Sequence, residues 1–322
     1  MSAVEIHEVT KTFGPFTAVD HLSLEVPRGS IYGFIGPNGS GKTTTLRMIM
    51  RILHPDRGHI RVLGEQSTDA ANDRVGYLPE ERGLYRQMKV RDLLRFYAEL
   101  KSCRHSKSAI DSWLERMGLT NWASKKIQAL SKGMAQKVQF IATVVAKPEL
   151  VLLDEPFSGL DPVNTDVFRE AILSLKREGA TVIFSTHDMG VAEKMCDSIF
   201  MIYKGRKVLD GTLQSIQQTY GSDTVRVRLE ENGAINWDGL PGVSKVMNFG
   251  RTQELRLERG ADSQTVLAAL MTRGTVRHFE MSHPSLHDIF VRIATPSDSP
   301  LPLGGEGQGE GEMEQTEESY HA

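Results

Sequence analysis

Short runs of uninterrupted apolar residues recur along the first part of the chain, with helix-like patterns between them. Three such runs occupy residues 31–35, 150–153 and 181–184. Continuous apolar runs suit strands of a sheet that is covered on both faces. Between Val90 and Ala146 the periodicity is mostly helical, which predicts a helical insertion before the second of these strands. The pattern predicts an α/β domain that ends near Gly211.

A second pattern begins after a polar join at residues 217–223. Period-two segments occupy 225–229 and 254–258, and helix-like segments follow at 263–273 and 284–293. This combination predicts a small α+β domain over residues 222–294, which is a normal size for a domain. Pro284 is expected to start the closing helix, whose Leu286, Ile289 and Phe290 are expected to face a core.

Charge is distributed unevenly along the 322 residues, although the formal net charge is only -3. The segment 296–322 carries seven acidic residues and no lysine or arginine, which leaves 38 basic against 34 acidic residues elsewhere. Nucleic-acid binding usually needs a strongly basic face, so no nucleic-acid partner is expected. The segment 296–322 is too polar and glycine-rich to bury a core, which predicts a disordered acidic tail.

The sequence shows neither a membrane span nor a secretion signal. No run reaches the roughly 18 apolar residues that a spanning helix needs. Residues 1–14 lack the basic, apolar and small-residue sections of a signal peptide. Because Cys103 and Cys196 are the two cysteines, no disulfide framework is available and a cytosolic location is expected.

The strongest motif follows the first apolar run directly and fits the pattern G-x-x-x-x-G-K-[ST]. Its glycines let successive backbone N–H groups turn toward phosphate oxygens, and the N-terminus of the following helix adds positive potential. Lys42 is predicted to reach the terminal phosphates of a nucleotide, and the Thr43 hydroxyl to ligate Mg²⁺. The nucleotide-binding residues predicted from this motif are Gly36, Pro37, Asn38, Gly39, Ser40, Gly41, Lys42, Thr43 and Thr44.

The second apolar run, 150–153, ends in the adjacent carboxylates Asp154 and Glu155. Adjacent side chains diverge at the end of a strand, so one acid can face a metal ion while the other faces a water molecule. Phosphoryl transfer to water needs both roles. We therefore predict Asp154 as a Mg²⁺ ligand, and Glu155 as the group that orients or deprotonates the attacking water.

Further motifs resemble those of the ATP-binding cassette (ABC) family. Residues 130–137, LSKGMAQK, are similar to the family's signature sequence, which lies between the phosphate loop and the acidic strand. Residues 158–162 resemble the family's D-loop, and residues 185–188 its switch histidine. Phe13 matches the aromatic residue that stacks on adenine in this family.

This resemblance covers about residues 3–212. It implies a P-loop NTPase fold of the α/β class, with a mixed sheet core and a helical insertion. The nucleotide-binding domain is expected to span residues 1–215, and its helical subdomain about residues 86–146. ATP and Mg²⁺ are the implied cofactors, and ATP hydrolysis is the implied activity.

The resemblance also implies two partners. Ser131 and Gly133 would meet ATP held by a second copy of the cassette, which gives a head-to-tail dimer with two sandwiched nucleotides. Asp161 would communicate across that interface, and His187 would contact the γ-phosphate. The other implied partner is a polytopic membrane permease, which would hold the chain at the inner face of the cell membrane. Ser131 is also a good cap for the helix that follows, independently of any nucleotide.

Two stretches depart from the family pattern. The signature has Lys132 and Met134 where the commonest sequence, LSGGQ, has glycine and glutamine. In GYLPEERGLY, residues 76–85, Glu80 stands where the family usually has a glutamine that senses Mg²⁺ and the attacking water. A carboxylate keeps an oxygen ligand and adds a negative charge that a divalent cation favours. Glu80 is therefore predicted to join the Mg²⁺ shell.

The closing residues 284–290, with the strands before them, resemble the small domain attached to ABC ATPases of bacterial sodium and antibiotic exporters. The implied function is the ATPase subunit of an exporter. Two alternatives stay open from the sequence. One is the ATPase subunit of an ABC importer, and the other is a non-transport ABC ATPase that acts on ribosomes or DNA.

Overall fold

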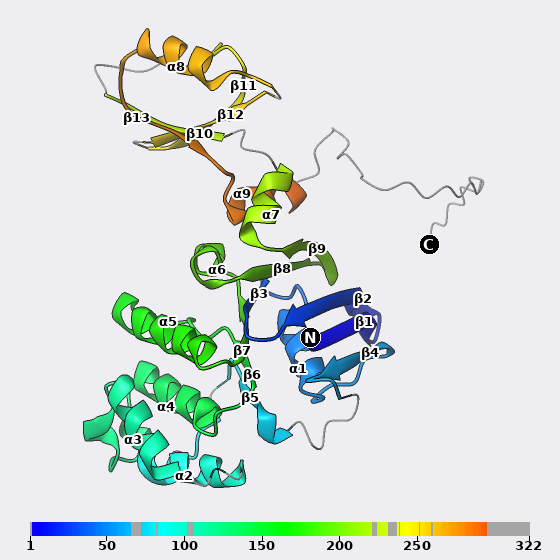
Figure 1. Ribbon diagram of the computed structural model, residues 1–322, viewed down its shortest axis with the longest axis vertical. Coiled ribbons are helices and arrows are strands. Elements are labelled where there is room, and N and C mark those ends of the chain that lie inside the picture. The colour runs from blue at the N-terminus through cyan, green and yellow to red at the C-terminus, as the bar shows by residue number, and fades with distance from the viewer. Residues whose placement is uncertain are drawn as a thin grey trace, which may run out of the picture.

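The chain forms a large body and a smaller sheet domain above it in Figure 1. The predicted tail at 296–322 lies outside the described residues. So does Arg82 of the GYLPEERGLY stretch. The computed structural model describes residues 2–65, 72–81, 83–101, 103, 106–220, 224–230, 237, 239–250, 252–258 and 260–294.

A three-stranded antiparallel sheet carries the N-terminus. Its strand order is β2-β1-β4. The first two strands form a hairpin in which Phe13 pairs with Phe16 across Gly14, whose φ of +58° lies in the left-handed region that glycine tolerates best. The three strands are β1 (Ser2–Phe13), β2 (Phe16–Pro27) and β4 (Arg57–Val62).

A six-stranded sheet forms the centre of the large body, with the order β5-β6-β7-β3-β8-β9. Neighbouring strands from β5 to β8 run parallel, and β9 pairs antiparallel with β8. The predicted α/β class with a mixed sheet is confirmed. The strands are β3 (Ile31–Ile35), β5 (Val75–Leu78), β6 (Leu150–Asp154), β7 (Thr181–Thr186), β8 (Ser198–Tyr203) and β9 (Arg206–Gly211).

The two faces of this sheet are covered differently. One face packs on α1 (Lys42–Ile49) and the three-stranded sheet, and the other packs on a layer of four helices. This double cover explains why β3, β6 and β7 are buried along their whole length. The four helices are α2 (Val90–Leu100), α3 (Ser106–Arg116), α4 (Lys132–Val144) and α5 (Pro162–Arg177). Short 3-10 helices occupy Asn72–Arg74, Thr120–Trp122 and Ile127–Ala129.

The small C-terminal domain is an antiparallel sheet with the order β11-β12-β10-β13. Apolar side chains of β10 and β12 pack against Val266 and Leu270 of α8 (Ser263–Met271). Strands β10 and β12 and helix α8 lie where the sequence pattern predicts them, whereas β11 and β13 were not predicted. The strands are β10 (Thr224–Glu230), β11 (Val243–Phe249), β12 (Thr252–Leu257) and β13 (Thr275–Ser282).

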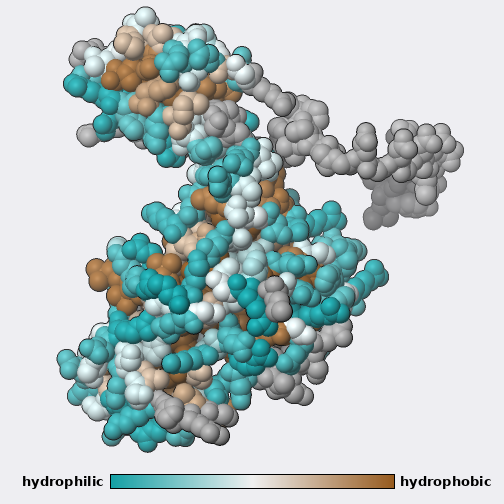
Figure 2. Space-filling view, viewed as in Figure 1, coloured by the Kyte–Doolittle hydropathy of each residue, from teal (hydrophilic) through white to brown (hydrophobic). Residues whose placement is uncertain are grey.

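The closing helix α9 (Leu286–Ala294) faces a core, as expected, but that core belongs to the large body. Leu286 and Ile289 are fully buried in a cluster with Ile35 of β3 and residues of β8 and α6 (Met189–Met195). Helix α7 (Leu213–Tyr220) contributes Ile216 to the same cluster. Figure 2 shows hydrophobic surface at this neck between the two parts. The domain limits 1–215 and 222–294 stay a prediction.

Candidate functional site: a phosphate-loop cleft

Four neighbouring parallel strands deliver the predicted chemical groups to one edge of the central sheet. Glu80 follows β5, and Asp154 ends β6 with Glu155 directly after it. His187 follows β7, and the phosphate loop follows β3. Because the carboxyl ends of parallel strands meet at one edge, residues far apart in the sequence become neighbours there. Ligands of open α/β sheets bind at this kind of edge.

The phosphate loop is packed too closely for larger residues at two of its glycines. A Cβ atom at Gly36 would lie 2.2 Å from the carbonyl oxygen of Ile202. A Cβ atom at Gly41, whose φ is +112°, would lie 2.5 Å from the carbonyl oxygen of Ala18. Helix α1 begins at Lys42, so its free N–H groups and positive dipole end face the loop. The loop therefore has the backbone geometry of an anion site.

Lys42 is buried in the middle of the site. Its Nζ donates to the carbonyl oxygens of Gly36 at 2.7 Å and Pro37 at 3.2 Å. It also lies 3.5 Å from Oε1 of Glu155, and these two side chains are only 6% and 8% exposed. Burial lowers the pKa of Lys42, and the charge of Glu155 opposes that shift. The ammonium group is thus held next to the loop and to the predicted catalytic carboxylate.

Asp154 has one satisfied oxygen and one unsatisfied oxygen. Its Oδ1 accepts hydrogen bonds from the Thr43 hydroxyl at 3.1 Å and the Ser185 hydroxyl at 2.6 Å. Its Oδ2 is buried and has no hydrogen-bond partner among the described residues. A buried carboxylate oxygen without a partner is unfavourable unless another group, such as a cation, satisfies it. Asp154 with Thr43 therefore fits the oxygen ligands that Mg²⁺ prefers.

Glu155 is held in place by Ser185 and His187. Its backbone has a φ of +48°, which is uncommon for a residue with a side chain and marks a functional turn more often than chance. Its N–H donates to the Ser185 hydroxyl at 2.9 Å, and its Oε2 lies 3.1 Å from Nδ1 of His187. Ser185 thus positions both acids at once. In the sequence, Ser185 is recognisable only as part of the histidine motif at residues 185–188, and this role was not predicted.

The cleft beside these residues has a volume of about 440 Å³. Two exposed aromatic side chains, Phe13 and Phe16, stand on one side, with Nζ of Lys11 5.6 Å from the centre of the Phe13 ring. Phe16 was not predicted, although its spacing from Phe13 across a Gly-Pro turn is visible in the sequence. We call this space the phosphate-loop cleft, and it is lined by Phe13, Phe16, Ala18, Asn38, Gly39, Gly41, Lys42, Thr43, Thr44, Glu80 and Glu155.

Glu80 lines the phosphate-loop cleft with its side chain exposed. The next residue is tied to the helical layer, because Nε2 of Gln139 in α4 donates to the carbonyl oxygen of Glu81 at 3.1 Å. Gln136 of the same helix donates to the carbonyl oxygen of Pro156, next to Glu155, at 2.8 Å. Helix α4 is therefore connected to both acidic segments of the cleft.

Comparisons with known proteins agree with this geometry. Residues 19–158 match the family model described as ABC transporter, and residues 211–294 match that of the "ATP-binding protein DrrA1-3-like, C-terminal domain". "Uncharacterized ABC transporter ATP-binding protein YhaQ" of Bacillus subtilis is 41% identical over 291 residues, which are 89% of this chain and 96% of the relative. The chain belongs to the ATP-binding proteins of ABC transporters. This ABC ATPase binds and hydrolyses ATP, as members of the family do.

Other relatives carry names that state a process. "Nod factor export ATP-binding protein I" of Paraburkholderia xenovorans is 32% identical over 91% of this chain and 97% of its own length. "Linearmycin resistance ATP-binding protein LnrL" of Bacillus subtilis is 30% identical over 90% of this chain and 97% of its own. A solved "ATP binding subunit of ABC transporter" superposes with a TM-score of 0.65 at 29% identity, covering 68% of this chain and 93% of that one.

The remaining predicted site residues of the ABC ATPase lie outside the phosphate-loop cleft. Ser131 caps α4 by accepting a hydrogen bond from the N–H of Met134 at 3.3 Å, and Asp161 caps α5 by accepting one from the N–H of Asn164 at 2.9 Å. Both caps are exposed. At Gly133 a Cβ atom would meet nothing closer than 3.7 Å, so packing within this chain does not require glycine there.

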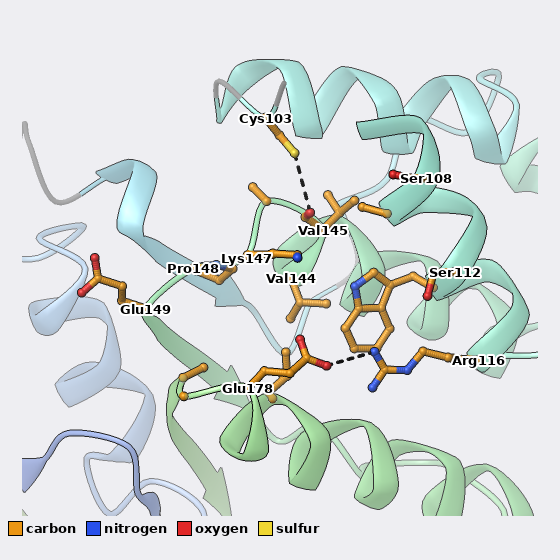
Figure 3. Close-up of a pocket in the computed structure, with 16 residues that line it drawn as sticks. Cys103, Ser108, Ser112, Arg116, Val144, Val145, Lys147, Pro148, Glu149 and Glu178 are labelled. Carbon is orange, nitrogen blue, oxygen red and sulfur yellow. Dashed lines mark hydrogen bonds and ion pairs between the residues drawn. The ribbon is translucent and has the colours of Figure 1, made fainter. Parts of the chain in front are cut away.

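A larger cavity, of about 860 Å³, lies at the opposite edge of the central sheet (Figure 3). It is bounded by α3, the segment from α4 to β6 and the end of α5, and we call it the amino-edge cavity. Three of its charged residues are paired or partnered, since Arg116 contacts Glu178 at 3.4 Å and Glu149 contacts Arg74 at 2.6 Å. The guanidinium of Arg116 also stacks over the Trp113 ring at 4.0 Å. None of the predicted site residues lines it.

Proposed function

We propose that this ABC ATPase powers export, through ATP-driven closure of a head-to-tail dimer on a membrane permease. The observation that carries the catalytic part is the buried group of Lys42, Asp154 and Glu155 at the mouth of the phosphate loop. The names of two relatives, one for Nod factor export and one for linearmycin resistance, support export over import. Neither of these names refers to ribosomes or DNA.

The chemistry follows from the residues of the phosphate-loop cleft. Loop N–H groups and Lys42 would bind the phosphates of ATP, and Phe13 would stack on adenine. Thr43, Asp154 and Glu80 would hold Mg²⁺, which neutralises charge on the phosphates when bound. Glu155 would accept a proton from water, because its Oε1 is buried beside Lys42 and has no hydrogen-bond partner in the described part of the chain.

His187 lies where it can orient the carboxylate of Glu155. Its Nδ1 lies 3.1 Å from Glu155, and its side chain is 55% exposed, so the rest of the ring is open to a ligand. We propose that the ring contacts the γ-phosphate while it holds the carboxylate in orientation. In this role His187 links the phosphate being cleaved to the group that activates water.

The proposed dimer uses the helix ends that the cleft leaves exposed. Ser131, Gly133 and Asp161 lie at the N-termini of α4 and α5, where dipole ends and unpaired N–H groups attract phosphate. These residues would complete the nucleotide site of a second copy. Glycine at 133 lets that copy approach closely.

The permease is proposed to contact the face around GYLPEERGLY. Tyr85 and Phe96 stack edge to face and are 56% and 37% exposed, with Leu100 exposed nearby on α2. Exposed aromatic residues in contact are a common feature of protein interfaces. In the described part of the chain, no helix is long and apolar enough to cross a membrane. The proposed location is the cytoplasmic face of the membrane, through the permease.

Size-exclusion chromatography with light scattering tests the dimer. The Glu155→Gln chain should elute as a dimer with MgATP and as a monomer with MgADP, because bound ATP persists without hydrolysis. Adding Ser131→Arg should restore the monomer. A Glu155→Gln chain that binds ATP yet stays monomeric would contradict the dimer.

Co-purification tests the transport role. A tagged chain recovered from detergent-solubilised membranes of its own host should bring down a polytopic membrane protein. Recovery from ribosome or DNA fractions alone would contradict export. Accumulation of the substrate inside cells that lack the chain would support export, and reduced uptake would support import.

A further inference from the structure

Helix α6 begins immediately after the switch histidine. Asp188 caps the helix by accepting a hydrogen bond from the N–H of Val191 at 3.1 Å. The N–H of Asp188 itself donates to the Thr186 hydroxyl at 3.0 Å. His187 is therefore held between the end of β7 and the first turn of α6. A shift of α6 must move the imidazole ring relative to Glu155.

One side of α6 is packed tightly against the sheet. A Cβ atom at Gly33 in β3 would lie only 2.5 Å from Sγ of Cys196, at the end of α6, so glycine is what permits the contact. Ala192 is fully buried in the cluster that includes Ile35, the residue just before the phosphate loop. The helix has no room to move toward the sheet. On the face of α6 that points away from the sheet, the helix is held by the element that packs against it.

Helix α9 covers that other side. Glu193 of α6 accepts a hydrogen bond from the N–H of Leu286, the first residue of α9, at 2.5 Å. The rest of this helix end is capped internally, because Ser285 and Asp288 exchange hydrogen bonds in a capping box. Leu286 and Ile289 then pack beside Ala192. The free N–H and positive dipole end of α9 are thus matched by a carboxylate from α6.

Strand β13 of the small C-terminal domain leads into α9 through His283 and the buried Pro284. The carbonyl oxygen of Pro284 accepts a hydrogen bond from Gln217 of α7 at 3.2 Å, and Arg292 of α9 donates to the carbonyl oxygen of Tyr220 at 3.3 Å. The junction is therefore braced at both ends of α9. Displacement of the C-terminal sheet would be passed to α9 and from there to α6.

We propose that Glu193 is a positioning residue for ATP hydrolysis: by fastening α9 to α6 it holds His187 against Glu155 and couples the small C-terminal domain to turnover. The proposal rests on the role proposed above for His187. Glu193 does not line the phosphate-loop cleft, so it acts through the histidine and not on ATP. Nucleotide affinity should then be independent of Glu193.

The test uses the full-length chain and separates turnover from binding. Glu193→Ala should lower kcat about fivefold with the Kd for ATP unchanged, as expected when an interaction that matters only during reaction is lost. Glu193→Gln keeps an oxygen that can accept from Leu286, so its kcat should stay within about twofold of wild type. Lys194→Ala, an exposed change on the same helix, should leave both constants unchanged.

A double-mutant cycle distinguishes positioning from general destabilisation. If Glu193 acts through His187, the double variant Glu193→Ala/His187→Ala should turn over no more slowly than His187→Ala alone. Leu270→Ala weakens the core of the small C-terminal domain but leaves the contact between Glu193 and Leu286 in place, so it should lower thermal stability while reducing kcat less than Glu193→Ala does. If Glu193→Ala does not fold, Glu193→Asp, one methylene shorter, should show a smaller loss of kcat.

The possible failures are separable. A wild-type kcat in Glu193→Ala would overturn the coupling while His187 keeps its role. So would a double variant whose fold loss of kcat equals the product of the two single losses. No rescue by Glu193→Gln in a folded chain would also overturn it. Wild-type turnover in His187→Ala would instead overturn the proposed role of the histidine, and the coupling with it.

Discussion

Each edge of the central sheet carries a hollow, and the two hollows differ in the chemistry of the residues that line them. At the carboxyl edge the phosphate-loop cleft, about 440 Å³, holds buried carboxylate oxygens without hydrogen bonds and a buried lysine. At the amino edge the cavity of about 860 Å³ is lined by alanines, valines and two carboxylates, Glu149 and Glu178, that contact arginines of the same chain. The phosphate-loop cleft, although smaller, is the hollow with buried carboxylate oxygens that lack a hydrogen-bond partner among the described residues.

This difference shows why volume alone does not locate a site. Strand ends place loops at both edges, and the loops after β3 and β6 supply buried groups that a ligand would satisfy. A buried oxygen such as Oδ2 of Asp154 is costly until something binds it. At the amino edge, Glu178 and Glu149 already have arginine partners. Matched substitutions at the two edges can test this contrast.

The largest effect is expected for Glu155→Gln. Loss of the general base should lower kcat by on the order of 10²-fold or more, because the amide cannot accept the proton of the attacking water. MgATP binding should persist. Glu178→Gln at the amino edge should leave kcat unchanged. A phosphate-release assay with both variants measures this, and near-wild-type turnover in Glu155→Gln would remove Glu155 from its role.

Lys42→Ala should come next. Removal of the buried ammonium that faces the phosphate loop should weaken ATP binding by on the order of 10²-fold, through loss of charge-assisted hydrogen bonds to phosphate. Lys147→Ala, at the mouth of the amino-edge cavity, should bind ATP normally. Titration with a fluorescent ATP analogue measures both constants. If Lys42→Ala and Lys147→Ala bound the ATP analogue with equal affinity, the nucleotide site would not be specific to the carboxyl edge.

Glu80→Gln should have a moderate effect, limited to the Mg²⁺ dependence of ATPase activity. An amide is a weaker Mg²⁺ ligand than a carboxylate, so half-maximal ATPase activity should need about tenfold more Mg²⁺. Glu149→Gln, which loses a surface ion pair with Arg74, should leave the Mg²⁺ titration unchanged. If the Glu80→Gln titration overlays the wild-type curve, Glu80 is a solvated side chain.

The smallest effect is expected at the amino edge itself. Arg116→Ala removes the stack over Trp113 and the contacts with Glu178 and Ser174, which should cost about 1 kcal/mol of stability. The melting temperature should fall by about 2–4 °C. Calorimetry measures this loss, and ATP affinity serves as the internal reference. Weakened ATP binding in Arg116→Ala would show that the amino edge influences the cleft.

Much of the site was predictable because its motifs are local. The phosphate loop occupies consecutive residues, and Asp154 and Glu155 directly follow an apolar strand, so their chemistry is visible without a fold. Ser185 could not be assigned, because serine in a strand has no distinctive pattern and its bonds to both acids exist only after β6 and β7 pair. Phe16 was missed because an exposed aromatic residue in a hairpin has many uses.

The C-terminal region shows a different limit. Strand β13 has no regular alternation of buried and exposed residues, so period-two reasoning gave no signal for it. Helix α9 was predicted correctly as amphipathic, with Leu286 and Ile289 on its buried face. Amphipathicity says that a helix has a partner but does not say which one. Here the partner is the large body and not the adjacent sheet.

The sequence by itself determined the α/β class, the phosphate loop, the acidic strand end and the family resemblance, since each depends on residues close together in the chain. Only the tertiary structure decided that Ser185 serves both acids, that Lys42 pairs with Glu155, and that α9 is fastened to α6 by Glu193. These contacts join residues many positions apart. Their geometry is set by strand order and helix packing, which local patterns do not encode.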